Sequence, residues 1–292
     1  MIIPFIRMLR PRQWIKNVLV FAGIIFSQNY HDAASWLVSL EMFIAFSLVA
    51  SAIYIINDIC DAPLDRLHPV KKYRPIATGE IDPRFGGMLA VILLVVGLTW
   101  SWKIDSWVFQ IMVGYTVMMI AYSLLLKKIL LMDVFIIAIG FMMRPMAGAA
   151  AIGVIISKWL MICAFFIGLT LALIKRRQEL ARLEGDAEKG RASLWDAPPL
   201  QIWDHWIMMI SAVTVVGYTL YTIDPITVAH VGSQKLLYTT PVVVFALFRY
   251  HVQSYARGSG EDPTEVVLSD PWILFSIVAW IAVVMFVFMG WI

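Results

Sequence analysis

Charged residues are scarce in this chain. Asp, Glu, Lys and Arg make up 15% of its 292 residues, whereas a soluble domain carries about 25%. Hydrophobic residues make up 61% of the chain, which exceeds the roughly 45–50% that is usual in soluble domains. The composition therefore excludes an ordinary soluble domain and predicts an integral membrane protein, which we expect to be all-α.

Other absences narrow the chemistry. No Gly-rich phosphate loop, Ser/His/Asp arrangement or His-based metal motif is visible, which excludes those kinds of site. The two cysteines, Cys60 and Cys163, lack metal-type spacing and an obvious disulfide partner, so we interpret both as packing residues. No run of Ser, Gly or Pro divides the chain, and we expect a single membrane domain over residues 1–292. We expect no nucleic-acid partner.

Long hydrophobic runs are what the chain does have. A transmembrane helix needs about 20 mainly apolar residues, and runs of that length predict a bundle of nine transmembrane helices. With approximate boundaries, the runs cover residues 14–31, 35–57, 84–102, 106–126, 130–152, 157–175, 205–223, 235–254 and 270–292.

Lys and Arg are distributed unevenly between the loops that join these runs. Nineteen of the 23 basic residues fall in the N-terminal segment or in loops on the same side of the predicted bundle. Only Lys103, Lys158 and Lys235 fall on the other side, and Arg144 lies within a run. Because cytoplasmic loops carry an excess of Lys and Arg, we expect a multi-pass plasma-membrane protein with its N-terminus in the cytoplasm and its C-terminus outside.

An acidic cluster ends the second predicted span. Asn57, Asp58, Asp61 and Asp65 recur at helical spacing, which predicts that they share one face of a helix. Such carboxylates repel each other unless a cation lies among them, and Mg²⁺ is bound by one or two carboxylates together with phosphate oxygens. The cluster therefore predicts a magnesium site with these four residues as ligands and the three aspartates as the catalytic group.

Two points about the cluster stay open at this stage. Pro63 removes a helical hydrogen bond, so we expect the helix to bend or restart there, with Asp61 as a candidate cap and the direction of Asp65 undecided. The alternative to a metal site is a solvated loop with helix caps and surface ion pairs.

Basic residues accompany the acids on this expected cytoplasmic side. Arg binds phosphate through a planar fork and Lys acts as a point charge, so bases beside a metal site predict a substrate that carries a diphosphate. Topology alone explains part of this basic character. The candidate substrate-binding residues on this side are Lys16, Asn17, Asn57, Arg66, His68, Lys71, Lys72, Arg74, Tyr122, Lys128, Lys175, Arg176, Arg177 and Glu179.

Three consecutive bases end the sixth predicted span. Lys175, Arg176 and Arg177 fit either a substrate phosphate or anionic lipid at the membrane surface. Glu179 and the later Glu184, Asp186 and Glu188 argue against anchoring alone, because such acids supply internal ion pairs or an additional metal ligand.

Arg144 is a further candidate, placed in the middle of the predicted span that contains GFMMRPMAGAA. An Arg at the bilayer centre costs roughly 2.5–3.5 kcal/mol on insertion scales, so we expect it to face an internal cavity and an anionic substrate. A structural pair with the intramembrane Asp133 is the alternative. Gly140 and Gly148 flank Arg144 and predict close approach of neighbouring helices.

The motif NDxxDxxxD at residues 57–65, in a nine-span chain, resembles the UbiA superfamily of intramembrane prenyltransferases. The resemblance extends over essentially the whole chain. It implies that Mg²⁺ and a substrate diphosphate lie between two Asp-rich motifs, in the second-to-third and sixth-to-seventh loops. The second motif is absent here, because KRRQEL at residues 175–180 stands where DxxxD is expected.

This departure is similar to one branch, the decaprenyl-phosphate phosphoribosyltransferases. The similarity rests on KRRQEL together with RPRQWIKN at 10–17, NDICDAPLDRLHPVKKYRPIATG at 57–79, AYSLLLKK at 121–128 and MRPMAG at 143–148. It implies transfer of 5-phosphoribosyl from 5-phosphoribosyl 1-diphosphate to a polyprenyl phosphate such as decaprenyl phosphate, with Mg²⁺ as cofactor. The product would supply arabinose donors for cell-wall glycans such as arabinogalactan.

Two other functions remain as hypotheses. A prenyltransferase would move a prenyl group from its diphosphate to an aromatic acceptor, although the missing second acidic motif argues against it. A lipid transporter or flippase would carry polar residues near the membrane midplane, whereas most polar residues here gather on one side. The number of subunits stays open, and a homo-oligomer is one alternative.

Overall fold

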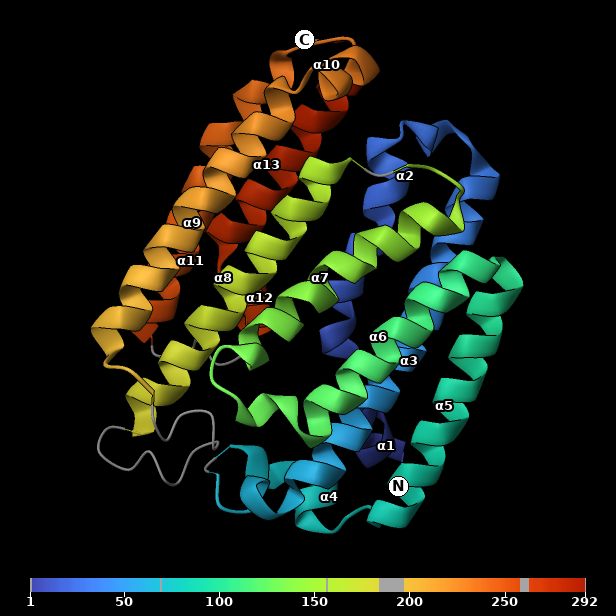
Figure 1. The fold of residues 1–292 in the computed structure, drawn as a ribbon, viewed down its shortest axis with the longest axis vertical. Coiled ribbons are helices and arrows are strands. Elements are labelled where there is room, and N and C mark those ends of the chain that lie inside the picture. Colours follow the sequence, from blue (N-terminus) through green and yellow to red (C-terminus); the bar gives the residue numbers. More distant parts are fainter. Residues whose placement is uncertain (1, 69, 156, 184–196, 258–262, 292) are drawn as a thin grey trace. The chain divides into compact units, whose positions relative to one another are not determined.

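The protein is helical throughout the part of the chain that the structure describes. The computed structural model describes residues 2–68, 70–155, 157–183, 197–257 and 263–291, and no strand occurs in these ranges (Figure 1). Seven of the described helices are long and apolar enough to cross a membrane. A bent pair, Pro225–Val231 with Lys235–Tyr255, makes an eighth if it counts as one span. The all-α membrane class is confirmed, whereas the count of nine and the orientation stay predictions.

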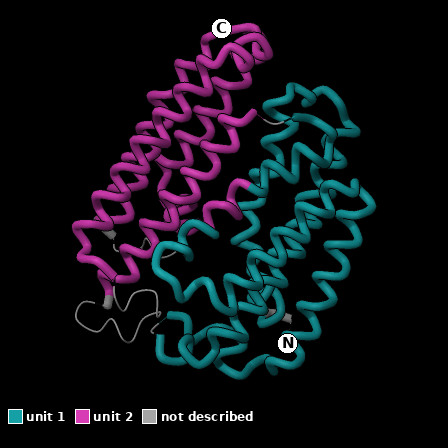
Figure 2. Tube along the Cα trace, in the orientation of Figure 1, with its two compact units in different colours: residues 1–136, 143–156 teal, residues 137–142, 157–292 magenta. Residues whose placement is uncertain are grey.

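Two compact units divide the chain, and each is described by itself below. Unit 1 comprises residues 1–136 and 143–156, and unit 2 comprises residues 137–142 and 157–292 (Figure 2). Helix α7, Met132–Ala151, contributes residues to both units. The single domain over 1–292 stays a prediction.

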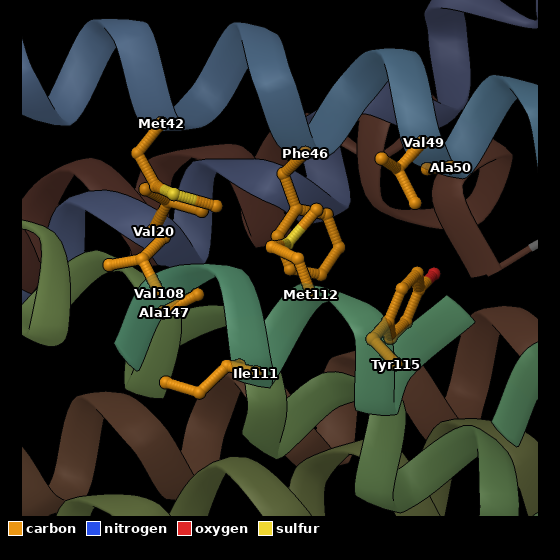
Figure 3. Close-up of a cluster of buried hydrophobic side chains, with 10 residues drawn as sticks. All are labelled: Val20, Met42, Phe46, Val49, Ala50, Val108, Ile111, Met112, Tyr115 and Ala147. Atoms are coloured by element: carbon orange, nitrogen blue, oxygen red, sulfur yellow. The ribbon is translucent and has the colours of Figure 1, made fainter. Parts of the chain in front are cut away.

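Unit 1 is built around the long helix α3, Ala33–Asp65. This helix packs against α5, α6, η1 and the short helices α1 and α4. A core cluster joins α3, α6, α7 and η1 through residues such as Met42, Phe46, Met112 and Ala147 (Figure 3). The remaining elements of unit 1 are α1 Ile2–Leu9, η1 Pro11–Phe21, α2 Ala22–Phe26, η2 Asn29–His31, η3 Lys71–Tyr73, α4 Pro75–Thr78, α5 Pro83–Ile104, α6 Ser106–Leu124 and η4 Leu126–Lys128.

The first predicted span differs from the structure. Residues 14–31 form parts of a 3₁₀ segment and two short helices, η1, α2 and η2, instead of one α-helix of spanning length. Backbone contact with α7 accompanies this path: a Cβ on Gly148 would overlap the Val20 carbonyl oxygen, and a Cβ on Gly23 would lie 2.8 Å from Ala149 Cα. The close approach expected at Gly148 is therefore confirmed.

Unit 2 contains the remaining long helices. Helix α8, Lys158–Leu183, packs mainly on α9, Leu200–Ile223, while α11, Thr240–Arg257, packs on α13, Pro271–Phe288. The short elements are α10 Pro225–Val231, η7 Lys235–Thr239 and α12 Pro263–Ser269. Asp270 caps the N-terminus of α13 by accepting hydrogen bonds from the backbone N–H groups of Trp272 and Ile273, both at 3.0 Å.

The two cysteines differ in their surroundings. Cys163 is 3% exposed in unit 2, which confirms its interpretation as a packing residue. Cys60 is exposed, so the same interpretation is wrong for it. Both thiols are free.

Candidate active site

The three aspartates of the acidic cluster lie on one face of α3, in its last two turns. Asp58, Asp61 and Asp65 are 2%, 7% and 4% exposed. Helix α3 continues through Pro63 to Asp65, so the expected restart of the helix is wrong. Only Leu64 and Asp65 follow the proline within the helix, and the loss of one hydrogen bond so close to the C-terminus is therefore tolerated. Asp65 consequently points the same way as Asp58, two turns earlier.

Arg74 joins the first and last of these carboxylates. Its Nη1 lies 3.1 Å from Asp58 Oδ1 and 2.5 Å from Asp65 Oδ2. Arg10 also pairs with Asp58, and its guanidinium lies 5.3 Å from the centroid of the Tyr54 ring. The Arg74 guanidinium therefore lies between Asp58 and Asp65, and Arg10 lies beside Asp58.

Asp61 belongs to a second group within the cluster. Lys127 Nζ donates to Asp61 Oδ1 at 2.6 Å and to Asn57 Oδ1 at 3.2 Å. The Asn57 amide in turn donates to Asp61 Oδ2 at 3.0 Å. Lys127 is 7% exposed, so its ammonium and the Asp61 carboxylate form a buried ion pair.

Arg10 and Lys127 were not among the residues chosen from the sequence. Arg10 is 48 positions before Asp58, and Lys127 is 66 positions after Asp61, so no local spacing connects them to the acids. A signal was nevertheless present, because both fall within the motifs RPRQWIKN and AYSLLLKK that carry the family resemblance. Arg10 adopts a left-handed backbone conformation, with φ 52°. Burial lowers the pKa of its guanidinium, while the Asp58 carboxylate opposes that shift.

Several predicted bases around the cluster have other contacts. Arg66 Nε donates to the Ala77 carbonyl at 3.1 Å, and the Lys72 ammonium lies 5.2 Å from the Tyr73 ring centroid. His68 Nδ1 accepts hydrogen bonds from the backbone N–H groups of residues 70 and 71, both at 3.2 Å. These contacts order the loop that carries Arg74.

Two adjacent lysines in the connection after α6 differ in their exposure. Lys127 is buried in the cluster, whereas Lys128, which the sequence singled out, is exposed. Tyr122 is 7% exposed within unit 1.

Arg144 and Asn17 lie together in the interior of unit 1. Arg144 Nε donates to Asn17 Oδ1 at 2.9 Å, and its Nη2 donates to the Tyr115 hydroxyl at 3.3 Å. The Asn17 amide donates to Ser47 Oγ at 3.0 Å, and the Arg144 guanidinium lies 5.2 Å from the Phe46 ring centroid. Figure 3 shows Phe46 and Tyr115 side by side. Polar and aromatic groups from η1, α3 and α6 therefore surround this guanidinium.

Lys16 and Asp133, the residue considered as a partner of Arg144, have local contacts. Lys16 Nζ donates to Gln13 Oε1 at 2.5 Å. Asp133 Oδ1 accepts from the Val134 backbone N–H at 2.8 Å, at the start of α7.

The bases of KRRQEL lie at the C-terminal end of α8 in unit 2. Arg176 is 1% exposed and pairs with Glu179 at 2.5 Å, one helical turn later. Arg177 pairs with Asp204 of α9, whereas Lys175 is half-buried. The predicted internal ion pair of Glu179 is therefore present. The later acids Glu184, Asp186 and Glu188 lie outside the described residues.

The donor set of α3 is suited to a hard divalent cation that arrives with phosphate. Across the described ranges, no three His, Cys, Asp or Glu side chains are grouped closely enough to hold a metal ion by themselves. Mg²⁺ needs only one or two carboxylates when phosphate oxygens and waters complete its shell. Asp58 and Asp65, which already share one cationic partner, supply such a pair.

Similarity to a protein-family model identifies the family of this chain. The model of the UbiA prenyltransferase family matches residues 18–269. The chain belongs to the UbiA prenyltransferase family. Its fold agrees: a solved UbiA homolog from Archaeoglobus fulgidus, bound to GPP and Mg²⁺, superposes with a TM-score of 0.72. That superposition covers 98% of this chain and 99% of the other, at 20% sequence identity.

Several curated relatives of this UbiA-family protein are decaprenyl-phosphate phosphoribosyltransferases. The decaprenyl-phosphate phosphoribosyltransferase of Mycobacterium tuberculosis is 31% identical over 96% of this chain and 92% of its own length. The protein of the same name from Corynebacterium glutamicum is 34% identical over 94% of this chain and 84% of its own length. The family and these relatives support a transferase that is embedded in a membrane.

Proposed function

We propose that this UbiA-family protein transfers 5-phosphoribosyl from 5-phosphoribosyl 1-diphosphate to a polyprenyl phosphate, such as decaprenyl phosphate, and releases diphosphate. The names of relatives at 31–34% identity support this donor and acceptor. One observation of the structure carries the proposal: three buried carboxylates at the end of α3 are paired with Arg10, Arg74 and Lys127 from three other segments. This is a site for a diphosphate and a metal ion together.

Charge balance explains why both are needed. The three carboxylates and the three cationic side chains of this cluster cancel, so a bare diphosphate gains little from entering it. A divalent cation that binds Asp58 and Asp65 would release Arg74 from them, and the freed guanidinium can then bind phosphate oxygens bidentately. Mg²⁺, when bound, neutralises charge on the departing diphosphate. Arg10 and Lys127 supply further positive charge beside it.

The transfer itself requires few protein groups. The bond between ribose C1 and the diphosphate oxygen breaks with oxocarbenium character, and an oxygen of the acceptor phosphate forms the new bond to C1. The acceptor phosphate is already anionic near neutral pH, so no general base is required. Arg144 and Lys16 are our candidates for orienting it. In this proposal the polyprenyl tail lies in the bilayer, and the reaction occurs on the cytoplasmic side of the plasma membrane, where it would supply arabinose donors for cell-wall glycans.

A donor assay tests this proposal directly. Protein purified in detergent is incubated with MgCl₂ and either labelled 5-phosphoribosyl 1-diphosphate plus decaprenyl phosphate, or labelled prenyl diphosphate plus an aromatic acceptor. We expect a labelled lipid product from the first mixture and its loss with a chelator or in Asp58→Asn. Product from the second mixture alone would contradict the proposed donor and support prenyl transfer instead.

A further inference from the structure

The charged end of α8 is joined to two neighbouring helices of unit 2 by consecutive residues. Arg177 Nε and Nη2 donate to the two carboxylate oxygens of Asp204 on α9, at 3.0 and 3.3 Å. Gln178 Nε2 donates to the Ser254 carbonyl on α11 at 2.9 Å. This end of α8 is therefore fixed on both sides.

Tyr255 completes the contact on the α11 side. Its hydroxyl donates to Asp204 Oδ1 at 2.6 Å, and its ring centroid lies 4.6 Å from the Arg177 guanidinium carbon. The guanidinium is thus held along one edge by a carboxylate and across its face by an aromatic ring, and one carboxylate joins all three helices. Lys could not replace Arg here, because an ammonium lacks both the planar fork and the stacking face.

The neighbouring bases of KRRQEL differ from Arg177. Arg176 is buried and pairs with Glu179 on its own helix, and Lys175 is half-buried. Arg177 is 18% exposed and Asp204 is 30% exposed, so their ion pair contributes little to stability. Its planar geometry, in contrast, restricts how α8 can turn or move relative to α9 and α11.

We infer that Arg177 is a positioning residue that acts through Asp204 and Tyr255, and that it does not itself bind a substrate phosphate. Through these contacts Arg177 fixes the end of α8 relative to α9 and α11. The side chains of Lys175, Arg176 and Glu179 are therefore held in one orientation. The inference rests on the proposed function, and on the expectation from the sequence that the turn at residues 175–179 contributes to substrate binding. It assigns a role to Asp204 and Tyr255, neither of which was a candidate from the sequence.

Kinetics of matched variants test this role. For Arg177→Gln and Asp204→Asn we expect kcat to fall roughly ten- to a hundredfold, since small misplacements have effects of that size, with the donor KM unchanged within about twofold. Arg177→Lys should not restore kcat. Tyr255→Phe keeps the ring and removes the hydroxyl, so its loss should be smaller. The double variant of Arg177 and Asp204 should be no slower than either single variant.

A distance measurement gives a readout that does not depend on any activity. Spin labels at positions 180 and 252, in a background without the two native cysteines, report the separation of α8 from α11. The distribution should broaden in Arg177→Gln and in Asp204→Asn. The matched control is Arg249→Gln, which breaks a comparable bidentate pair with Asp270 and should leave both this distribution and kcat unchanged.

The outcomes separate the inference from the proposed function. A raised donor KM in Arg177→Gln, with normal kinetics in Asp204→Asn, would make Arg177 a direct phosphate ligand and overturn the inference, as would an unchanged distance distribution. If only prenyl transfer is detected, the proposed donor fails, and the same kinetic comparison is made with prenyl diphosphate. Broadening in both variants with the loss of kcat would then still support the positioning role.

Discussion

Removing the Lys127 ammonium separates what the charged cluster contributes to stability from what it contributes to catalysis. Lys127→Met keeps the length of the side chain and leaves the Asp61 carboxylate, 7% exposed, without its ammonium partner. At 2.6 Å, the attraction lost is about 6 kcal/mol in an effective dielectric of about 20. Desolvation offsets part of this, and breaking a buried pair on one side costs about 3–5 kcal/mol. We expect a loss of that size.

The double variant Lys127→Met/Asp61→Asn supplies the decisive comparison. It removes both charges, so we expect its unfolding free energy to return to within about 1–2 kcal/mol of wild type, while phosphoribosyl transfer stays absent. Urea unfolding in detergent, followed by tryptophan fluorescence, measures the first quantity, and the donor assay measures the second. If the double variant is as unstable as Lys127→Met, the two side chains are not energetically coupled and the reasoning is refuted.

Four further predictions follow from particular residues. Gly148→Ala should lower the unfolding free energy by about 1–3 kcal/mol through overpacking, whereas Gly114→Ala, whose Cβ would lie 3.7 Å from its nearest neighbour, should be neutral or stabilising; equal melting temperatures would contradict this. The pKa of Asp270 lies below its ordinary value because the Arg249 guanidinium on α11 donates hydrogen bonds to its carboxylate. Its stabilising effect is therefore present above about pH 4 and lost as pH falls through the lowered pKa, and melting curves of Asp270→Asn should lack this loss. Asp58→Asn, or chelation of Mg²⁺ in the wild type, should abolish product in the donor assay without unfolding the protein. Arg74→Gln should lower the Mg²⁺ concentration needed for half-maximal activity and raise the donor KM, as measured by Mg²⁺ titration of initial rates.

The sequence predicted the acidic face because its geometry is local. Asp58, Asp61 and Asp65 recur at the spacing of one helix, and the structure keeps them on one face. Arg10 and Lys127 were not predicted, because their contacts with the acids are not local. Tertiary packing brings them to the acids from 48 and 66 positions away in the sequence. A base chosen for its proximity in sequence, such as Lys72, instead contacts its own loop.

Hydropathy predicted the long helices well, because a run of about twenty apolar residues has the length and composition of a transmembrane helix. Seven of the predicted runs coincide with helices of spanning length. The run at 14–31 does not, although its composition is similar. Its path depends on backbone contact with α7, where Gly148 allows the Val20 carbonyl to approach, and hydropathy does not encode such contacts.

The two buried groups of charge differ in how they depend on the fold. Arg176 and Glu179 are one turn apart on α8, so that pair forms together with the helix. The aspartates of α3 receive their cations from three separate segments, and the cluster is complete only when those segments have packed. Mg²⁺ would compete with these cations for the carboxylates, while the same cations would attract the diphosphate. Metal and diphosphate therefore favour each other's binding by charge alone, because each relieves the repulsion that the other would meet. A neutral cluster of this kind discriminates against either ion alone, which suits a transferase whose donor is a magnesium diphosphate.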